Sequence, residues 1–234
     1  MGFAVMDAKV THPAVTHPVV TDPPFPPIAP GPVHRWGGAR LIVARRADLH
    51  RAPPLSPAEE RVVRALPPWR QAEWLAGRLL AKLLVGVAVT GTAHDVEILP
   101  RDDGSPRVLV SGSPVPGVYL SISHTAHHVA AALAPEPVGV DLCENGSAAA
   151  VYRVADHVLS PRERSLIGTD RPALAAGAWA LKEAAVKADR SGIFGAAARG
   201  VVILGLDPPV LGGRRRAMVW QAGDAVLALV LARP

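Results

Sequence analysis

The sequence has few cysteines and few aromatic residues, and both shortages limit what it can be. Its single cysteine, Cys143, cannot form a disulfide within the chain, which is typical of proteins kept in a reducing compartment. Aromatic residues make up 4% of the chain and apolar residues 49%, so a core would consist mainly of alanine, valine and leucine. This apolar share excludes wholesale disorder, and 234 residues suffice for one large domain or two small ones.

The sequence also lacks a long apolar run without charges. The best candidate for a membrane span, residues 74–93, is interrupted by Arg78 and Lys82. The first residues have neither the basic start nor the apolar middle of a signal peptide. We therefore predict a soluble cytoplasmic protein. Its net charge of +5 and pI of about 10 favour acidic partners, which include nucleic acid, phosphorylated ligands and acidic proteins.

Proline is concentrated at the N-terminus, where Thr-His-Pro at 11–13 and 16–18 is followed by Thr-Asp-Pro at 21–23. Proline removes backbone donors and fixes φ, so we predict a disordered proline-rich tail over residues 1–32. The rest of the chain predicts an α+β protein with two similar lobes. We place the N-terminal lobe at 33–134 and the C-terminal lobe, with the functional site, at 135–234.

Hydrophobic periodicity and turn residues predict the elements of both lobes. We expect a hairpin over 128–143 with its turn at 135–137, and we find no sequence repeat between the halves. Helices are expected at 56–66, 70–87, 160–168 and 172–190, and strands at 39–46, 95–100, 106–110, 117–123, 200–206, 216–222 and 225–232.

The helix expected at 172–190 places charged and aromatic side chains on one face. At 100° per residue, Glu183 and Lys187 follow Trp179 by 40° and 80°, with Lys182 on the other side of the tryptophan and an alanine-rich stripe opposite. One interpretation is a solvated surface with a Glu183–Lys187 pair. The other is the wall of a cleft, which would also explain the tryptophan.

The strand containing Asp141 favours the cleft. Alternation places Gly139, Asp141 and Cys143 on one face, and the glycine leaves space for another group to approach closely. A carboxylate from this strand and one from the helix could hold Mg²⁺ together with phosphate oxygens and water. Nearby lysines would then bind phosphate.

An ordered set of motifs resembles the Sfp-type 4′-phosphopantetheinyl transferases. These motifs are AGRLLAK (76–82), DDGSPRV (102–108), LSISHT (120–125), GVDLCE (139–144), LSPRE (159–163) and WALKEAAVKA (179–188), the last resembling the W/KEA signature. The resemblance implies two α+β lobes related by a pseudo-two-fold axis, with coenzyme A in the cleft between them. It also implies transfer of the phosphopantetheine arm to a carrier-protein serine, with release of adenosine 3′,5′-bisphosphate.

The resemblance assigns the central chemistry to the C-terminal lobe. Asp141 and Glu183 would bind Mg²⁺, with Mn²⁺ as an alternative, and Glu183 is also a candidate base for the carrier serine. Lys187 would bind the pyrophosphate, and Lys182 would help to position or neutralise it.

The N-terminal lobe would bind the rest of coenzyme A. Ser123 and His124 would contact its phosphates, with His124 at the 3′-phosphate, although a histidine simply bonded at a strand end is the alternative. The backbone of Gly104, Ser105 and Pro106 would run along the adenine. Arg78 matches a frequent family arginine and could equally be scaffold.

Three positions depart from the family pattern. Cys143 stands where a second acidic residue is frequent; we expect it to be structural, with two protein carboxylates and extra water around the metal. Ser105 replaces a common lysine, for which Arg70 or Arg107 could compensate. Glu163 matches a glutamate near the metal, but Ser160-x-x-Glu163 is also a capping box, which we favour.

The resemblance implies an apo acyl or peptidyl carrier protein as second substrate, and a monomeric enzyme. Such carriers are acidic around the modified serine, which suits a basic enzyme. A coenzyme A-binding relative that has lost activity is the first alternative. The second is a basic nucleic-acid-binding protein using Arg214–Arg216, but the sequence contains no recognisable reading module, and we expect no nucleic-acid partner.

Overall fold

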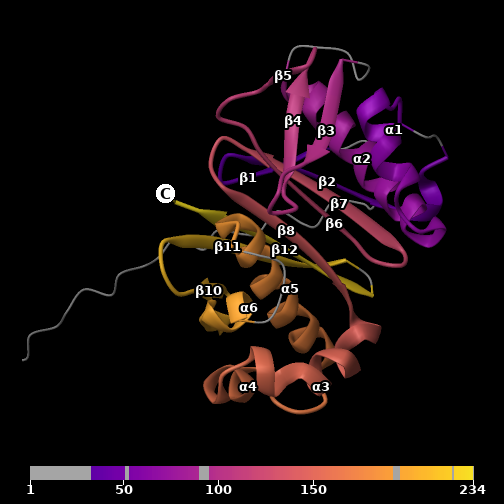
Figure 1. Cartoon of the computed structure of the whole chain (residues 1–234). Coiled ribbons are helices and arrows are strands. Elements are labelled where there is room, and N and C mark those ends of the chain that lie inside the picture. The colour runs from indigo at the N-terminus through magenta and orange to yellow at the C-terminus, as the bar shows by residue number, and fades with distance from the viewer. Residues whose placement is uncertain (1–32, 51–52, 90–94, 192–195, 223, 234) are drawn as a thin grey trace, which may run out of the picture.

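The first half of the chain folds into a lobe of sheet and helix (Figure 1). The computed structural model describes residues 33–50, 53–89, 95–191, 196–222 and 224–233, so the tail predicted at 1–32 lies outside it. The elements of this half are β1 (His34–Trp36), β2 (Ala39–Arg45), α1 (Pro57–Arg64), α2 (Pro68–Ala88), β3 (Val96–Pro100), β4 (Pro106–Val110), β5 (Ser113–Pro114), β6 (Tyr119–His124) and β7 (His128–Ala134).

The second half forms a lobe of similar composition below the first in Figure 1. Within the described residues, no helix is both long and apolar enough to cross a membrane. The elements of this half are β8 (Val138–Glu144), α3 (Ala148–Val158), α4 (Pro161–Ile167), α5 (Pro172–Asp189), α6 (Ala196–Gly200), β9 (Ile203–Leu206), β10 (Pro209–Leu211), β11 (Arg215–Ala222) and β12 (Ala225–Ala232).

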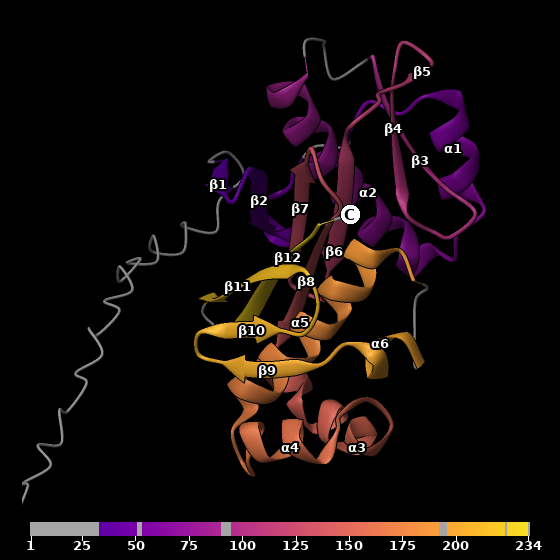
Figure 2. The same cartoon turned by 90° about the vertical axis from the view of Figure 1, so that its left-hand side faces the viewer.

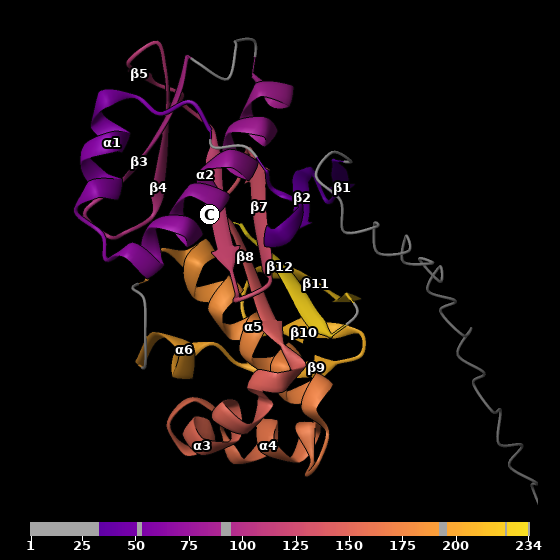
Figure 3. The same ribbon diagram turned by 90° about the vertical axis from the view of Figure 1, so that its right-hand side faces the viewer.

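Four layers build the body of the molecule: α2, the sheet β1-β2-β7-β6, the sheet β11-β12-β8, and α5 (Figures 2 and 3). Strands in the middle of such a stack are buried on both faces, and β7 and β12 accordingly have no polar face. In β12, the leucines 227, 229 and 231 face the other sheet, while the residues between them face α5. In β7, the alanines 130, 132 and 134 face the second sheet. Alternation along each strand thus divides the core into three apolar layers.

The hairpin predicted over 128–143 is wrong, because its two arms belong to different sheets. β7 pairs with β2 and β6, whereas β8 pairs with β12. Pro135 and Pro137 lack the N–H groups that a hairpin ladder would use, and the Pro137 carbonyl instead accepts a hydrogen bond from Ala232 N at 2.9 Å. The short turn therefore carries the chain from one layer to the next.

Serine hydroxyls join the two sheets where β6 lies beside β8. Ser121 Oγ accepts a hydrogen bond from Val140 N at 3.0 Å, and Ser123 Oγ accepts one from Leu142 N at 3.1 Å. Side chains thus take the place of a backbone ladder at this seam. Ser123 is thereby held at the strand that contains Asp141.

The two lobes repeat the same order of elements: a strand, a capped short helix, a long helix, a hairpin and a pair of antiparallel strands. The short helices α1 and α4 both begin with a capping box, Ser56 with Glu59 and Ser160 with Glu163. The Ser-Pro-x-Glu sequence at the start of each helix is therefore a short repeat between the lobes, although the sequence predicted none. These are similar α+β lobes, as expected, and most predicted helices and strands are confirmed to within a few residues. Helix α3 was not predicted from the sequence.

Gly139 sets the distance between β8 and α5. A Cβ atom at this position would lie 1.8 Å from the carbonyl oxygen of Ala184 and 2.7 Å from the backbone nitrogen of Ala188. The helix backbone therefore rests directly on the strand, as the space predicted beside Gly139 allows. Asp141, two residues along the same face of β8, is brought against the same helix.

We expect Gly139→Ala to lower the free energy of unfolding by about 3 kcal/mol or more, because backbone atoms on α5 cannot move aside as a side chain could. Urea unfolding followed by circular dichroism measures this. Gly146→Ala is the matched control, since no atom lies within 4 Å of the Cβ that it would add. Equal stability of the two variants would contradict the close contact.

Candidate active site

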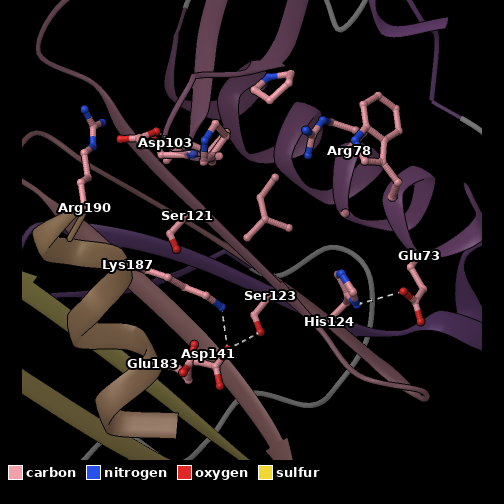
Figure 4. Close-up of a pocket in the computed structure, with 18 of the residues that line it drawn as sticks. Glu73, Arg78, Asp103, Ser121, Ser123, His124, Asp141, Glu183, Lys187 and Arg190 are labelled. Carbon is pink, nitrogen blue, oxygen red and sulfur yellow. Dashed lines mark hydrogen bonds and ion pairs between the residues drawn. The ribbon is translucent and has the colours of Figure 1, made fainter. Parts of the chain in front are cut away.

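A cavity of about 540 Å³ lies between the two lobes (Figure 4). Its walls come from α1, α2, the residues before β4, and β6 in the N-terminal lobe, and from β8 and α5 in the C-terminal lobe. The polar residues of its lining are Arg70, Glu73, Arg78, Asp103, Ser105, Ser121, Ser123, His124, Asp141, Glu183, Lys187 and Arg190. One chain therefore supplies both walls.

The C-terminal wall gathers two carboxylates and an ammonium group. Glu183 and Lys187 are one turn apart on α5, and Asp141 faces them from β8. Lys187 Nζ lies 2.6 Å from Asp141 Oδ1 and 3.1 Å from the carbonyl oxygen of Val140. Ser123 Oγ donates a second hydrogen bond to Asp141 Oδ1 at 2.8 Å. Asp141 is thus fixed from both lobes.

The Glu183 carboxylate has fewer partners than Asp141. Its Oε1 atom is buried and, among the described residues, has no hydrogen-bond partner. Burial raises the pKa of Glu183 to about 7, and the nearby charge of Asp141 adds to the rise while Lys187 opposes it. Two acidic groups and one lysine leave this corner short of positive charge, which favours binding of a cation.

The opposite wall, in the N-terminal lobe, carries the basic side chains Arg70, Arg78 and His124 together with the acidic Glu73 and Asp103. His124 Nδ1 lies 3.6 Å from Glu73 Oε2, and burial lowers the pKa of the histidine. Arg78 stacks on Trp74, with its Cζ 4.3 Å from the ring centre, and its Nε donates to the Ile98 carbonyl at 2.9 Å. Because burial lowers the pKa of Arg78 only to about 10, the guanidinium remains charged at neutral pH. The two arginines of this wall can each meet a negatively charged group of a ligand.

The turn before β4 closes one side of the cavity. Asp103 Oδ1 accepts hydrogen bonds from Ser105 N at 2.9 Å and from Ser105 Oγ at 2.6 Å. These bonds lower the pKa of Asp103 and fix the backbone of Gly104 and Ser105 along the cavity edge. Arg107, suggested as a replacement for the missing lysine, is not part of the cavity lining, whereas Arg70 is.

Comparison with known proteins relates this region to one superfamily. Residues 137–204 match the family model for the 4′-phosphopantetheinyl transferase superfamily. A holo-[acyl-carrier-protein] synthase of Geobacillus kaustophilus is 35% identical over 91 residues, which are 36% of this chain and 70% of that protein. The corresponding protein of Geobacillus sp. strain WCH70 is 32% identical over 83 residues, 33% of this chain and 69% of that protein. The chain belongs to the 4′-phosphopantetheinyl transferase superfamily.

Solved structures of two holo-[acyl-carrier-protein] synthases are also similar to part of this transferase. The Helicobacter pylori protein, solved in complex with coenzyme A, has a TM-score of 0.36 at 20% identity and is matched over 99% of its length by 41% of this chain. The Thermotoga maritima protein has a TM-score of 0.35 at 27% identity, with 64% of its length and 42% of this chain matched.

The structure brings together all but two of the site residues predicted for this transferase. The cavity lining includes Asp141, Glu183, Lys187, Ser123, His124, Gly104, Ser105, Pro106, Arg70 and Arg78. The two exceptions are Lys182, predicted at the coenzyme, and Glu163, considered as a metal ligand. They pair with each other inside the C-terminal lobe, with Lys182 Nζ 2.9 Å from Glu163 Oε1. The capping box favoured for Glu163 is confirmed.

The interpretation of the α5 charged face as one continuous cleft wall is therefore wrong in part. Lys182 points into the lobe, and Trp179 packs against the apolar cluster beneath α5. Only Glu183 and Lys187, one turn apart, reach the cavity. A helical wheel could not separate Trp179 and Lys182 from Glu183 and Lys187. It shows the angles between residues of one helix but not which other elements lie on each side of that helix.

Three charged residues of the cavity lining, Glu73, Asp103 and Arg190, were not predicted as site residues, although Asp103 lies within the motif DDGSPRV. The Glu73 carboxylate lies 3.6 Å from His124, and Arg190 follows α5 in a left-handed conformation with φ 52° and lies over the ring of Tyr119. Arg190 sits three residues after Lys187, so helical spacing was a usable signal. The sequence around Glu73 gave no such signal, because its partner His124 lies on a different element.

The residues next to Asp141 do not extend the carboxylate pair. Cys143 is buried in the apolar cluster against α5, and burial raises the pKa of its thiol to about 12. Glu144 turns away and accepts a hydrogen bond from His127 N at 3.1 Å, and β8 pairs with β12 without a bulge. Among the described residues, no cluster of three or more histidine, cysteine or acidic side chains could hold a metal ion.

The donor set of Asp141 and Glu183 nevertheless fits Mg²⁺. Carboxylate oxygens are the ligands that this ion prefers, and it is usually held by one or two of them together with water and substrate phosphates. The buried Glu183 Oε1 without a hydrogen-bond partner is the atom that such an ion would satisfy. Lys187 then remains close enough to meet an anion bound beside the metal.

In protein freed of metal, we expect Glu183→Gln to be more stable than the wild type at high pH. The folded-state pKa of about 7 lies above the ordinary value of 4.5, so stability present below pH 4.5 is lost as the pH rises through 7. The advantage of the variant should therefore grow between about pH 5 and pH 8, reaching at most about 3 kcal/mol. Urea unfolding in EDTA at several pH values measures it.

Glu60→Gln is the control, because Glu60 lies on the exposed face of α1 and pairs with Arg64 alone among the residues that the structure describes. An advantage for Glu183→Gln that does not change with pH would contradict the raised pKa.

Proposed function

We propose that this protein transfers the 4′-phosphopantetheine arm of coenzyme A to a serine of an apo acyl or peptidyl carrier protein, in a Mg²⁺-dependent reaction. The observation that carries the proposal is the group of Asp141, Glu183 and Lys187 in a cavity whose other wall presents two arginines and a histidine. Membership of the superfamily supports the chemistry, and the two Geobacillus relatives support an acyl carrier as the acceptor.

In the proposed reaction, the serine oxygen attacks the β-phosphorus of coenzyme A. The bond between that phosphorus and the bridging oxygen breaks, and adenosine 3′,5′-bisphosphate leaves with the bond's electrons. The serine proton passes to Glu183, directly or through a water molecule. Asp141 and Glu183 would hold Mg²⁺, or Mn²⁺ in its place, which when bound would offset charge on the pyrophosphate oxygens.

The remaining cavity residues would bind and orient the coenzyme. Lys187 offers its ammonium to the pyrophosphate, and Ser123 fixes the Asp141 carboxylate. His124 and Arg70 would meet phosphate groups from the N-terminal wall. The backbone at 104–106 would border the adenine.

The acceptor is proposed to dock electrostatically at the cavity mouth. The enzyme has a net charge of +5, and an acidic carrier would be steered toward it by this charge. We also propose that the enzyme acts as a monomer, because one chain supplies both walls of the cavity. Cys143 stands where an acidic residue is frequent in the family, but it is buried in the core. Its presence therefore leaves Asp141 and Glu183 in the cavity, which supports an active enzyme.

The first test is the intact mass of an apo carrier protein after incubation with enzyme, coenzyme A and Mg²⁺. We expect a gain of one phosphopantetheine arm, absent in EDTA and slowed about 100-fold or more in Glu183→Gln and Asp141→Asn. Glu60→Gln should transfer like the wild type. No gain on acyl and peptidyl carriers alike, with coenzyme A still bound, would instead indicate a relative that has lost activity.

The second test concerns His124 and the 3′-phosphate. We expect His124→Ala to weaken coenzyme A binding about tenfold and to leave binding of 3′-dephospho-coenzyme A unchanged, because a hydrogen bond to a charged group is lost. His127→Ala, an exposed neighbour outside the cavity lining, is the control. Isothermal titration calorimetry gives both affinities.

The contribution of His124 to coenzyme A binding should depend on pH. Burial lowers the pKa of His124, so the free enzyme holds it neutral near pH 7. A phosphate dianion would draw a proton onto the ring, so the part of the affinity lost in His124→Ala should increase from about pH 8 to about pH 6. Equal losses with both coenzymes would refute the assignment.

A further inference from the structure

The pair Glu163–Lys182 lies next to the carboxylate cluster but contributes nothing to the cavity lining. Lys182 is fully buried, and its ammonium lies 2.9 Å from Glu163 Oε1 and donates to the carbonyls of Ala198, at 3.1 Å, and Val201. The three donors of the ammonium are therefore all used. The pair leaves no donor for a phosphate.

The carboxylate of the pair is equally occupied. Glu163 Oε1 also accepts a hydrogen bond from Ile203 N at 2.8 Å, and its Oε2 accepts one from Ser160 N at 2.7 Å. The pair thus ties three elements together: α5 through Lys182, the start of α4 through Ser160, and β9 through Ile203. We call this arrangement the C-terminal strut.

The strut acts on the same helix that presents Glu183. Lys182 and Glu183 are consecutive in α5, so their side chains project about 100° apart, one into the lobe and one into the cavity. Glu183 Oε1 has no hydrogen bond among the described residues that could aim it. Its position therefore depends on the rotation of α5, which Gly139 limits on one side and the strut on another.

The N-terminal lobe contains the same arrangement, which we call the N-terminal strut. Lys82 Nζ, on α2, lies 2.7 Å from Glu59 Oε2, and Glu59 Oε1 accepts a hydrogen bond from Ile98 N at 2.9 Å. Both side chains are almost wholly buried. The residue after Lys82 is Leu83, which is 41% exposed and outside the cavity lining. The lysine of the C-terminal strut is therefore followed in sequence by a carboxylate of the site, whereas the lysine of the N-terminal strut is followed by an apolar residue.

We propose that Lys182 is a positioning residue that, with Glu163, fixes the rotation of α5 and so holds the Glu183 carboxylate beside Asp141, without contacting metal or coenzyme. The proposal rests on the proposed function for the role of Glu183. It follows that loss of either strut should lower the stability of the fold, whereas only loss of the C-terminal strut should lower the affinity for the metal.

The test compares Lys182→Met with Lys82→Met. Each variant is measured for its urea unfolding midpoint, for coenzyme A binding in EDTA, and for Mn²⁺ affinity in the presence of coenzyme A, using the electron paramagnetic resonance signal of free Mn²⁺. We expect both variants to be less stable than the wild type. Only Lys182→Met should weaken Mn²⁺ binding, by about tenfold or more, as loss of a supporting interaction around metal ligands does.

Coenzyme A binding in EDTA distinguishes positioning from direct contact. We expect Lys182→Met to bind coenzyme A in EDTA as the wild type does. Weaker binding there would identify Lys182 as a phosphate ligand and overturn the proposal. An equal change of Mn²⁺ affinity in both lysine variants, or none in Lys182→Met, would also overturn it.

A milder pair of variants covers the case in which Lys182→Met does not fold. Glu163→Gln and Glu59→Gln keep the size and the acceptor oxygen of each strut but remove its charge. We expect Glu163→Gln alone to weaken Mn²⁺ binding, and no difference between the two would overturn the proposal. If the wild-type protein binds Mn²⁺ and coenzyme A but does not transfer the phosphopantetheine arm, the proposed function is contradicted. The positioning role of Lys182 is not contradicted by that result.

Discussion

The contact between the backbone of α5 and Gly139 of β8 determines the site. A helix normally packs on a sheet through side chains, which hold the two backbones about 10 Å apart. Here the missing side chain and the alanines of α5 remove that spacer. Asp141, two residues further along β8, therefore lies opposite Glu183 and Lys187 instead of being separated from them by an apolar layer.

The N-terminal lobe completes this corner through hydroxyl groups. Ser121 and Ser123 bind backbone N–H groups of β8 that no neighbouring strand pairs with, and Ser123 also donates to Asp141. The seam between the lobes and the orientation of a site carboxylate therefore depend on the same side chain. Because the seam lies along the cavity, a shift of one lobe against the other would change the width of the cavity directly.

Much of the site could be predicted from the sequence, because the motif residues lie on elements with clear periodicity. The alternation around Asp141 and the helical spacing of Glu183 and Lys187 correctly placed their side chains in one cavity. What the sequence could not show was the partner of each buried charge. The position of Lys182 next to Glu183 predicted a lysine of the site. Only the fold shows that Lys182 pairs with Glu163 inside the lobe. For the same reason, two consecutive strands with a short turn predicted a hairpin, although β7 pairs with β2 and β6 on its two edges and β8 pairs with β12.

The paired struts show at which positions the two halves of the chain differ. Both halves keep the capped helix, the buried lysine and the strand that receives its glutamate, so the requirements of folding are the same in each. In the N-terminal half, however, Leu83 and Val87 follow the strut lysine where Glu183 and Lys187 follow it in the other. The same framework thus carries apolar side chains at these two positions in one half and charged side chains that reach the cavity in the other, so a repeated arrangement of elements supports an asymmetric cavity.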